Sequence, residues 1–206
     1  MRNDRSKKSG MALVQWTRQY LREYHEANDV PPRMSRPQVV VWTPPPMSRY
    51  KVNVDCAVFS AQKSEGVGVL IRDPFGQVVA AMSKKINAAL GALEAEAKAF
   101  EAGLQFALDV GVHDFILEGD SMLLCNALSG YSLPPSSVAS VVRGINMNCG
   151  VLCQVNFSHV KRQGNRSAHL LVKYALGIVD FLTWIEENPY FLVQTFIHDV
   201  SILCDS

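Results

Sequence analysis

Three acidic side chains stand in otherwise apolar surroundings, and their type suits metal chemistry. Asp55 interrupts a run of Val, Asn, Cys and Ala, although aspartate is disfavoured inside strands. Glu96 lies on the apolar stripe of a predicted helix, three residues before Ala99. Asp120 lies at a predicted strand-to-helix junction, directly before Ser121. A buried carboxylate is unfavourable unless it is paired or binds a cation.

Each acid also has an ordinary structural explanation. Asp55 fits a solvent-facing position on an edge strand, Glu96 a helix end near the N-terminal dipole, and Asp120 a helix N-cap. Their conjunction carries more weight, because two adjacent strands and a crossing helix would bring all three together. Three converging carboxylates repel one another unless cations neutralise them. An all-oxygen site of this kind suits Mg²⁺ or Mn²⁺.

The elements that position these acids follow from periodicity. Five strands are predicted, at 51–58, 66–72, 77–82, 115–118 and 154–160, with polar–apolar alternation in the first and the last. Strong helix formers and helical spacing predict four helices, at 88–110, 122–128, 136–148 and 165–176. The order βββαβααβα indicates an α/β fold, a mixed sheet with helices packed on it.

The chain divides into four predicted parts. Residues 1–30 form a basic leader with an amphipathic helix at 11–27, and 31–49 form a proline-rich linker that Trp42 pins onto the domain. The domain itself spans 50–177. The extension 178–206 is too apolar for a free tail, so we expect it to pack on the domain.

Composition excludes several classes of protein. The 206 residues have a net charge of +1, with nine Lys and Arg against four acids in the first 50 residues. No apolar run reaches the roughly 18–20 residues of a membrane helix, and the polar N-terminus has no secretory signal. Five cysteines at irregular spacing indicate reduced thiols in an intracellular, non-secreted protein, in the nucleus or the cytoplasm.

The chain resembles the type-1 ribonuclease H family, in particular the plant branch of reverse-transcriptase-like, retroelement-derived proteins. The resemblance covers about residues 42–176 and keeps the family's order of elements. It rests on an ordered set of motifs, 42–46 (WTPPP), 51–55 (KVNVD), 66–73 (GVGVLIRD), 96–104 (EAKAFEAGL), 118–121 (EGDS) and 159–171 (HVKRQGNRSAHLL). It implies a ribonuclease H-like mixed sheet of five strands, three antiparallel strands followed by two added in parallel.

The resemblance also implies a function, a metal-dependent endonuclease that hydrolyses the RNA strand of RNA–DNA hybrids. In that family four residues hold two divalent metal ions, and the matching positions are Asp55, Glu96, Asp120 and His169. Asp55 would bridge both ions. His169 replaces the usual fourth acid, so we expect a weakened second site and a preference for Mn²⁺ over Mg²⁺. As a structural alternative, His169 is a helix-face histidine bordering the core.

Two further positions depart from the family's pattern. Cys56 stands where the family usually has glycine after the first aspartate, and we interpret it as a small apolar side chain on the strand. The loop before Asn165 lacks the histidine of well-studied active members. His159 lies upstream and is better explained as a strand residue.

Contacts with the nucleic acid are expected from polar side chains near the site. Lys161, Arg162 and Arg166 would contact phosphates, and Asn53, Asn165 and Ser121 would contact sugar or phosphate groups. The family's basic handle is absent, since 136–148 holds a single cation, Arg143. We therefore expect weak, salt-sensitive binding and no membrane partner. The oligomeric state is left open.

Two alternatives stay open at the level of sequence. The first is a catalytically weak or inactive module of the same fold that binds nucleic acid or a protein, motivated by His169 and Cys56. The second is a phosphatase similar to the haloacid dehalogenases, motivated by the strand-end motif 52–57 (VNVDCA). It lacks the second aspartate two residues on, because that position is Ala57.

Overall fold

The structure is a computed structural model that describes residues 42–204. The basic leader 1–30, its amphipathic helix 11–27 and the linker up to residue 41 lie outside the described residues.

A mixed sheet organises the described chain. Strands β1 (Tyr50–Phe59), β2 (Ser64–Arg72) and β3 (Val78–Ile86) form an antiparallel meander. Strand β4 (Asp114–Gly119) pairs in parallel with β1, and β5 (Gln154–His159) pairs in parallel with β4. The order across the sheet is β5-β4-β1-β2-β3-β6. The α/β, ribonuclease H-like mixed sheet expected from the sequence is confirmed.

The sheet has a sixth strand that the sequence analysis did not predict. Strand β6 (Phe181–Ile185) lies in the C-terminal extension and pairs antiparallel with β3. Trp184 of β6 packs against the second apolar cluster, whereas Phe181 and Ile185 are 57% and 53% exposed on the other face. Since apolar side chains occupy both faces, β6 lacks the polar–apolar alternation that identified β1 and β5.

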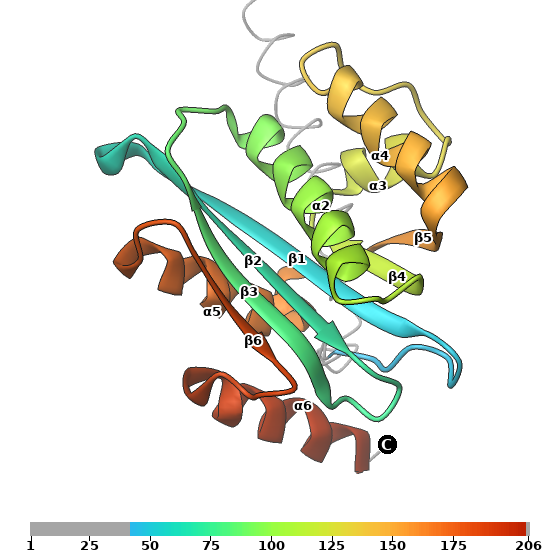
Figure 1. Cartoon of the computed structure of the whole chain (residues 1–206), viewed down its shortest axis with the longest axis vertical. Helices are drawn as coiled ribbons and strands as arrows, with labels where there is room; N and C mark the ends of the chain where they lie inside the picture. The colour runs from blue at the N-terminus through green and yellow to red at the C-terminus, as the bar shows by residue number, and fades with distance from the viewer. Residues whose placement is uncertain (1–41, 205–206) are drawn as a thin grey trace, which may run out of the picture. The chain divides into compact units, whose positions relative to one another are not determined.

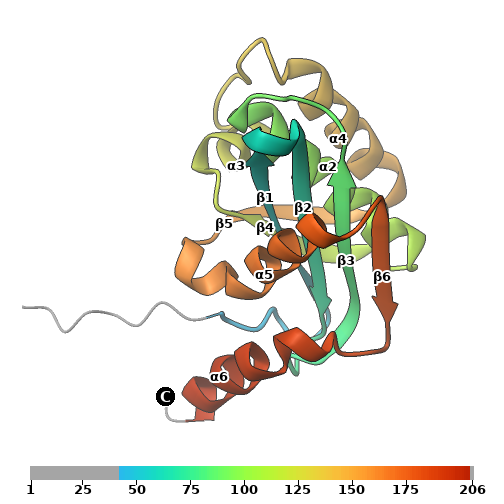
Figure 2. The ribbon, with the colours of Figure 1, turned by 90° about the vertical axis from the view of Figure 1, so that its left-hand side faces the viewer.

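Helices cover both faces of the sheet (Figures 1 and 2). Helix α2 (Ala92–Asp109) packs on β1 and β2, with α3 (Met122–Leu128) and α4 (Ala139–Leu152) beside it. Helices α5 (Arg166–Tyr174) and α6 (Val193–Cys204) lie on the opposite face, where Leu171 and Leu192 belong to a second apolar cluster. Among the described residues, no helix has both the length and the hydropathy to span a membrane.

Two glycines allow the helices that carry site residues to approach the sheet closely. A Cβ atom on Gly68 of β2 would lie 2.3 Å from the backbone oxygen of Ala168 in α5. A Cβ on Gly103 of α2 would lie 2.4 Å from Cγ1 of Val54 in β1. Any larger residue would push its helix away from the strand. The two contacts therefore fix α2 and α5 against the strands next to Asp55.

A buried polar network ties Trp42 and α6 to the sheet. Trp42 is 1% exposed, and its Nε1 donates to Oδ1 of Asn53 at 3.1 Å. The guanidinium carbon of Arg72 lies 3.7 Å from the centroid of the Trp42 ring, and Nη1 of Arg72 donates to Asp199 of α6 at 2.8 Å. Burial lowers the pKa of Arg72 to about 10, which still leaves it charged at neutral pH. Trp42 is thus fixed in place by its contacts with Asn53 and Arg72.

Candidate metal centre

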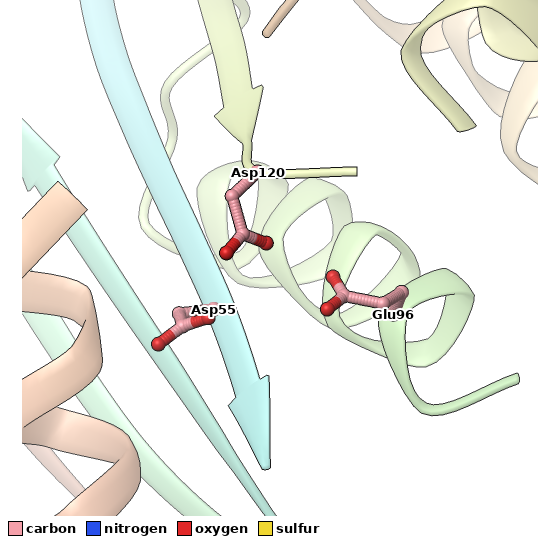
Figure 3. Close-up of side chains that lie close together, drawn as sticks. All are labelled: Asp55, Glu96 and Asp120. Carbon is pink, nitrogen blue, oxygen red and sulfur yellow. The ribbon is translucent and has the colours of Figure 1, made fainter. Parts of the chain in front are cut away.

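The sheet register brings Asp55 and Asp120 to the same edge. In the parallel β1–β4 pair Asn53 lies opposite Glu118, and the two aspartates follow two residues further along each strand. Glu96 comes from the N-terminal part of α2, which crosses above β1. One oxygen atom from each of the three carboxylates lies within 4.8 Å of the other two, and Figure 3 shows the three side chains close together. The structure thus brings together the three acids that the sequence singled out.

Crowding of negative charge changes the acidity of the cluster. Burial, together with the charges of Asp120 and Asp55, raises the pKa of Glu96 to about 7. Burial also raises the pKa of Asp55, against the opposing effect of its hydrogen bond with His169. Like charges held this close favour either protonation or a bound cation. Carboxylate oxygens in this arrangement fit a hard divalent ion such as Mg²⁺ or Mn²⁺.

His169 contacts the cluster through Asp55. Its Nδ1 lies 2.8 Å from Oδ2 of Asp55, and the ring comes from α5 on the opposite face from α2. His169 is outside the group of donor atoms that lie within 4.8 Å of one another. When Nδ1–H donates to the Asp55 carboxylate, that nitrogen has no lone pair left for a metal ion. The structure therefore gives His169 a role in orienting Asp55.

The thiol of Cys56 lies close enough to Glu96 for each group to affect the pKa of the other, a proximity that the sequence analysis missed. Consecutive strand residues point to opposite faces, so Cys56 faces α2 while Asp55 faces α5. Burial and the neighbouring carboxylates raise the pKa of the thiol far above its ordinary value, which keeps it protonated. A protonated thiol can donate to the Glu96 carboxylate. The alternation of strand residues after Asp55 is the sequence signal that could have placed Cys56 on the side of α2.

Two asparagines expected to contact nucleic acid are instead buried. Asn53 is 1% exposed; its Nδ2 donates to Glu118 at 3.1 Å and its Oδ1 accepts from Trp42. Asn165 is 2% exposed, and its Nδ2 donates to the backbone oxygen of Val54 at 2.8 Å. Both amide groups stabilise β1 from within, so in this structure their partners are protein groups, and contact with nucleic acid stays a prediction. The sequence could not reveal this, because their partners are distant in the chain.

The three expected cations lie at the surface, just before α5 and at its start. Lys161, Arg162 and Arg166 are all exposed, and they belong to or flank the 3₁₀ turn η2 (Arg162–Asn165) that precedes α5. Ser121 is half-buried at the N-cap of α3, directly after Asp120. These positions are compatible with phosphate contacts next to the carboxylates.

Comparison with solved structures shows the same fold. The chain is similar to RNase H1 from the halophilic archaeon Halobacterium salinarum NRC-1, with 26% identity and a TM-score of 0.57 over 63% of this chain and 98% of that one. LC11-RNase H1 in complex with an RNA/DNA hybrid is 20% identical, with a TM-score of 0.54 over 63% and 97% of the two chains. The N-terminal RNase H domain of Rv2228c from Mycobacterium tuberculosis is 20% identical, with a TM-score of 0.55 over 63% and 94%.

Comparison of sequences identifies the family. No curated protein matches the chain. The sequence model of the reverse transcriptase-like family matches residues 53–175, more than half of the chain. The matched region begins within β1, at Asn53, and contains Asp55, Glu96, Asp120 and His169. The chain therefore belongs to the reverse transcriptase-like family and has a ribonuclease H-like fold.

Proposed function

We propose that the protein is a divalent-metal-dependent endonuclease that hydrolyses the RNA strand of RNA–DNA hybrids. The observation that carries the proposal is the meeting of Asp55, Glu96 and Asp120 within 4.8 Å at the edge of a ribonuclease H-like sheet. Such a cluster is stable in its charged form when a cation is bound, and the raised pKa of Glu96 reflects that need.

Each carboxylate would have a defined task. Asp55, Glu96 and Asp120 would hold Mg²⁺ or Mn²⁺, and a bound ion would supply Lewis-acid stabilisation of the phosphate and a more acidic water. His169 would keep the Asp55 carboxylate oriented. Three carboxylates provide less negative charge than four, so we propose that a second ion binds weakly. We also propose that the site prefers Mn²⁺ to Mg²⁺. The plant, retroelement-derived origin stays a prediction from the motifs.

A cleavage assay tests the proposal. The substrates are an RNA–DNA hybrid, double-stranded RNA and double-stranded DNA of one sequence, each with a fluorophore, in Mg²⁺, in Mn²⁺ and in EDTA. We expect cleavage of the RNA strand of the hybrid alone, in metal alone. Asp55→Asn should abolish it. Equal cleavage by wild type and Asp55→Asn would contradict the assignment.

A non-catalytic nucleic-acid-binding module is the second candidate, favoured by one observation. Nδ1 of His169 is occupied by Asp55, so the site offers three carboxylates and no further ligand from that nitrogen. Under this alternative the protein binds the hybrid but leaves it intact in both metals. Fluorescence anisotropy with the labelled hybrid, followed by gel analysis of the same sample, distinguishes binding alone from binding with cleavage.

A further inference from the structure

We propose that Cys149 and Cys153 form a dithiol site that a small-molecule disulfide, such as oxidised glutathione, converts into an intramolecular disulfide bond. In the sequence these two residues are only members of a set of five irregularly spaced cysteines. The structure places both on one cavity, at the opposite end of the sheet from the carboxylate cluster. The inference therefore goes beyond the proposed nuclease function.

The two cysteines lie at the C-terminal end of α4, where the chain turns into β5 (Figure 1). Cys149 belongs to the last turn of the helix, and Cys153 follows its last residue, Leu152. Side chains four residues apart lie on the same face of an α-helix, and their Cα atoms are about 6 Å apart. A disulfide bond accommodates Cα separations of about 4.4–6.8 Å, so the spacing of the pair falls within this range.

The backbone at Cys153 has the freedom that closure of the bond needs. Cβ atoms four residues apart on a helix are about 5–6 Å apart, whereas a disulfide needs about 3.5–4.5 Å, so the two Cβ atoms must approach by about 1–2 Å. Cys153 is already extended, with φ −158° and ψ 165°. Since no helical turn follows it, its backbone can adjust without breaking the hydrogen bonds of an intact helix.

A cavity gives a small molecule access to both residues. Cys149 and Cys153 line a cavity of about 490 Å³, together with Arg49 and Asp114. Both cysteines are half-buried and pack against the main apolar cluster. The opposite wall is held in place by Arg49, whose Nη1 donates to Oδ1 of Asn156 at 2.6 Å and whose Nε pairs with Asp114. The thiols thus share an accessible site with a fixed frame.

The acidity of the two thiols agrees with their closeness. Burial, together with the neighbouring Cys153, raises the pKa of Cys149 to about 12. Burial also raises the pKa of Cys153, against the opposing effect of Cys149. Mutual effects of this kind require the two groups to be near each other. Because the thiolate is the reactive form, we expect the bond to form slowly, over hours.

The other described cysteines have different surroundings. Cys125 is buried, and its Sγ donates to the backbone oxygen of Ser158 at 3.2 Å. Cys56 lies beside Glu96 under α2, and neither residue lines the cavity. The site is also remote from the carboxylates, because Asp114 and Gln154 pair at the start of β4 and β5 whereas Asp120 follows the end of β4, about 20 Å further along the strand.

The reaction consists of two successive thiol–disulfide exchanges. The thiolate of one cysteine attacks a sulfur atom of oxidised glutathione, whose S–S bond breaks and releases one glutathione thiolate with the bonding electron pair. The thiolate of the second cysteine attacks the resulting mixed disulfide and releases the second glutathione. The two protons lost by the cysteines are taken up by the released thiolates, so the protein is oxidised by two electrons and glutathione disulfide is reduced by two.

The test equilibrates the full chain at fixed reduced glutathione with increasing oxidised glutathione, traps free thiols with N-ethylmaleimide and digests the protein with trypsin. Cys149 and Cys153 share one tryptic segment, 144–161, whereas the other three cysteines fall on the separate segments 52–63, 99–143 and 174–206. In oxidising buffer we expect segment 144–161 to lose two hydrogen atoms and to bind no maleimide. Dithiothreitol should reverse the change.

Variants and an unfolded control show whether the fold creates the site. Cys149→Ser should retain a glutathione mixed disulfide on Cys153, and Cys125→Ser should leave the midpoint for segment 144–161 within about 2-fold of wild type. A cross-link favoured by the fold should form at about 10-fold less oxidised glutathione in the native protein than in urea. Absence of the bond in the native protein, or equal midpoints with and without urea, would overturn the proposal. Neither result depends on nuclease activity, so the proposed function is tested separately.

Discussion

Replacing Glu96 by glutamine should stabilise the metal-free protein at alkaline pH. The folded state raises the pKa of Glu96 from 4.5 to about 7. Since each pKa unit corresponds to about 1.4 kcal/mol, ionised Glu96 destabilises the folded protein by up to about 3 kcal/mol at pH 8. Glutamine has nearly the same shape and carries no charge. We therefore expect a gain of about 1–3 kcal/mol, or about 2–12 °C in Tm for a domain of this size.

The pH dependence of this gain has a definite sign. A carboxyl group whose pKa is raised by folding contributes stability below its unfolded pKa, and that contribution is lost as the pH rises through the folded pKa. Wild type should therefore lose stability between about pH 4.5 and 7 relative to Glu96→Gln. At pH 5 the two proteins should differ by no more than about 1 kcal/mol.

Thermal unfolding followed by circular dichroism measures the effect in EDTA at pH 5 and pH 8. Glu101→Gln is a matched control, because Glu101 lies on the same helix and pairs at the surface with Lys98; its effect should stay below about 0.5 kcal/mol. Added Mn²⁺ should raise the Tm of wild type at pH 8 and have little effect on Glu96→Gln. A lower Tm of Glu96→Gln at pH 8, or an unchanged response to Mn²⁺, would refute the argument from charge crowding.

Three other changes have defined outcomes. Gly68→Ala places a methyl group 2.3 Å from a backbone oxygen of α5 and should lower the urea midpoint strongly, whereas Gly144→Ala, with open space around its Cβ position, should be neutral or mildly stabilising. Asp199→Ala leaves the buried Arg72 without its carboxylate partner, so chemical denaturation should show a loss of about 3–5 kcal/mol, most of it recovered by adding Arg72→Met. His169→Asp supplies a fourth carboxylate and should increase Mg²⁺-supported cleavage, whereas His169→Asn should not; equal rates would argue against a charge-limited site.

The core of the site was predictable from local sequence. Asp55, Glu96 and Asp120 each interrupt an apolar pattern, and strand and helix periodicity placed them on elements that meet. The mixed sheet also followed from the sequence pattern, because β1 and β5 alternate between polar and apolar residues and turn residues separate β2 from β3. Helix α2 begins later than expected, at Ala92, with Gly91 as its N-cap.

The features that escaped prediction depend on contacts between distant segments. The sequence places Asn53 on a strand but does not show that Trp42, Arg72 and Glu118 surround its amide. Strand β6 forms by pairing with β3, and its own sequence lacks the polar–apolar alternation typical of a strand. The Nδ1 contact of His169 with Asp55 likewise depends on how closely α5 packs on the sheet.

The most direct test of the central claim is hybrid cleavage in Mn²⁺ by Asp120→Asn and Asp109→Asn, side by side with wild type. Asp109 lies exposed at the end of α2, away from the carboxylate cluster, and hydrogen-bonds only to Gln105 among the described residues. We predict that Asp120→Asn loses cleavage of the RNA strand and that Asp109→Asn keeps the wild-type rate. Undiminished cleavage by Asp120→Asn would show that the three carboxylates are not the catalytic metal site.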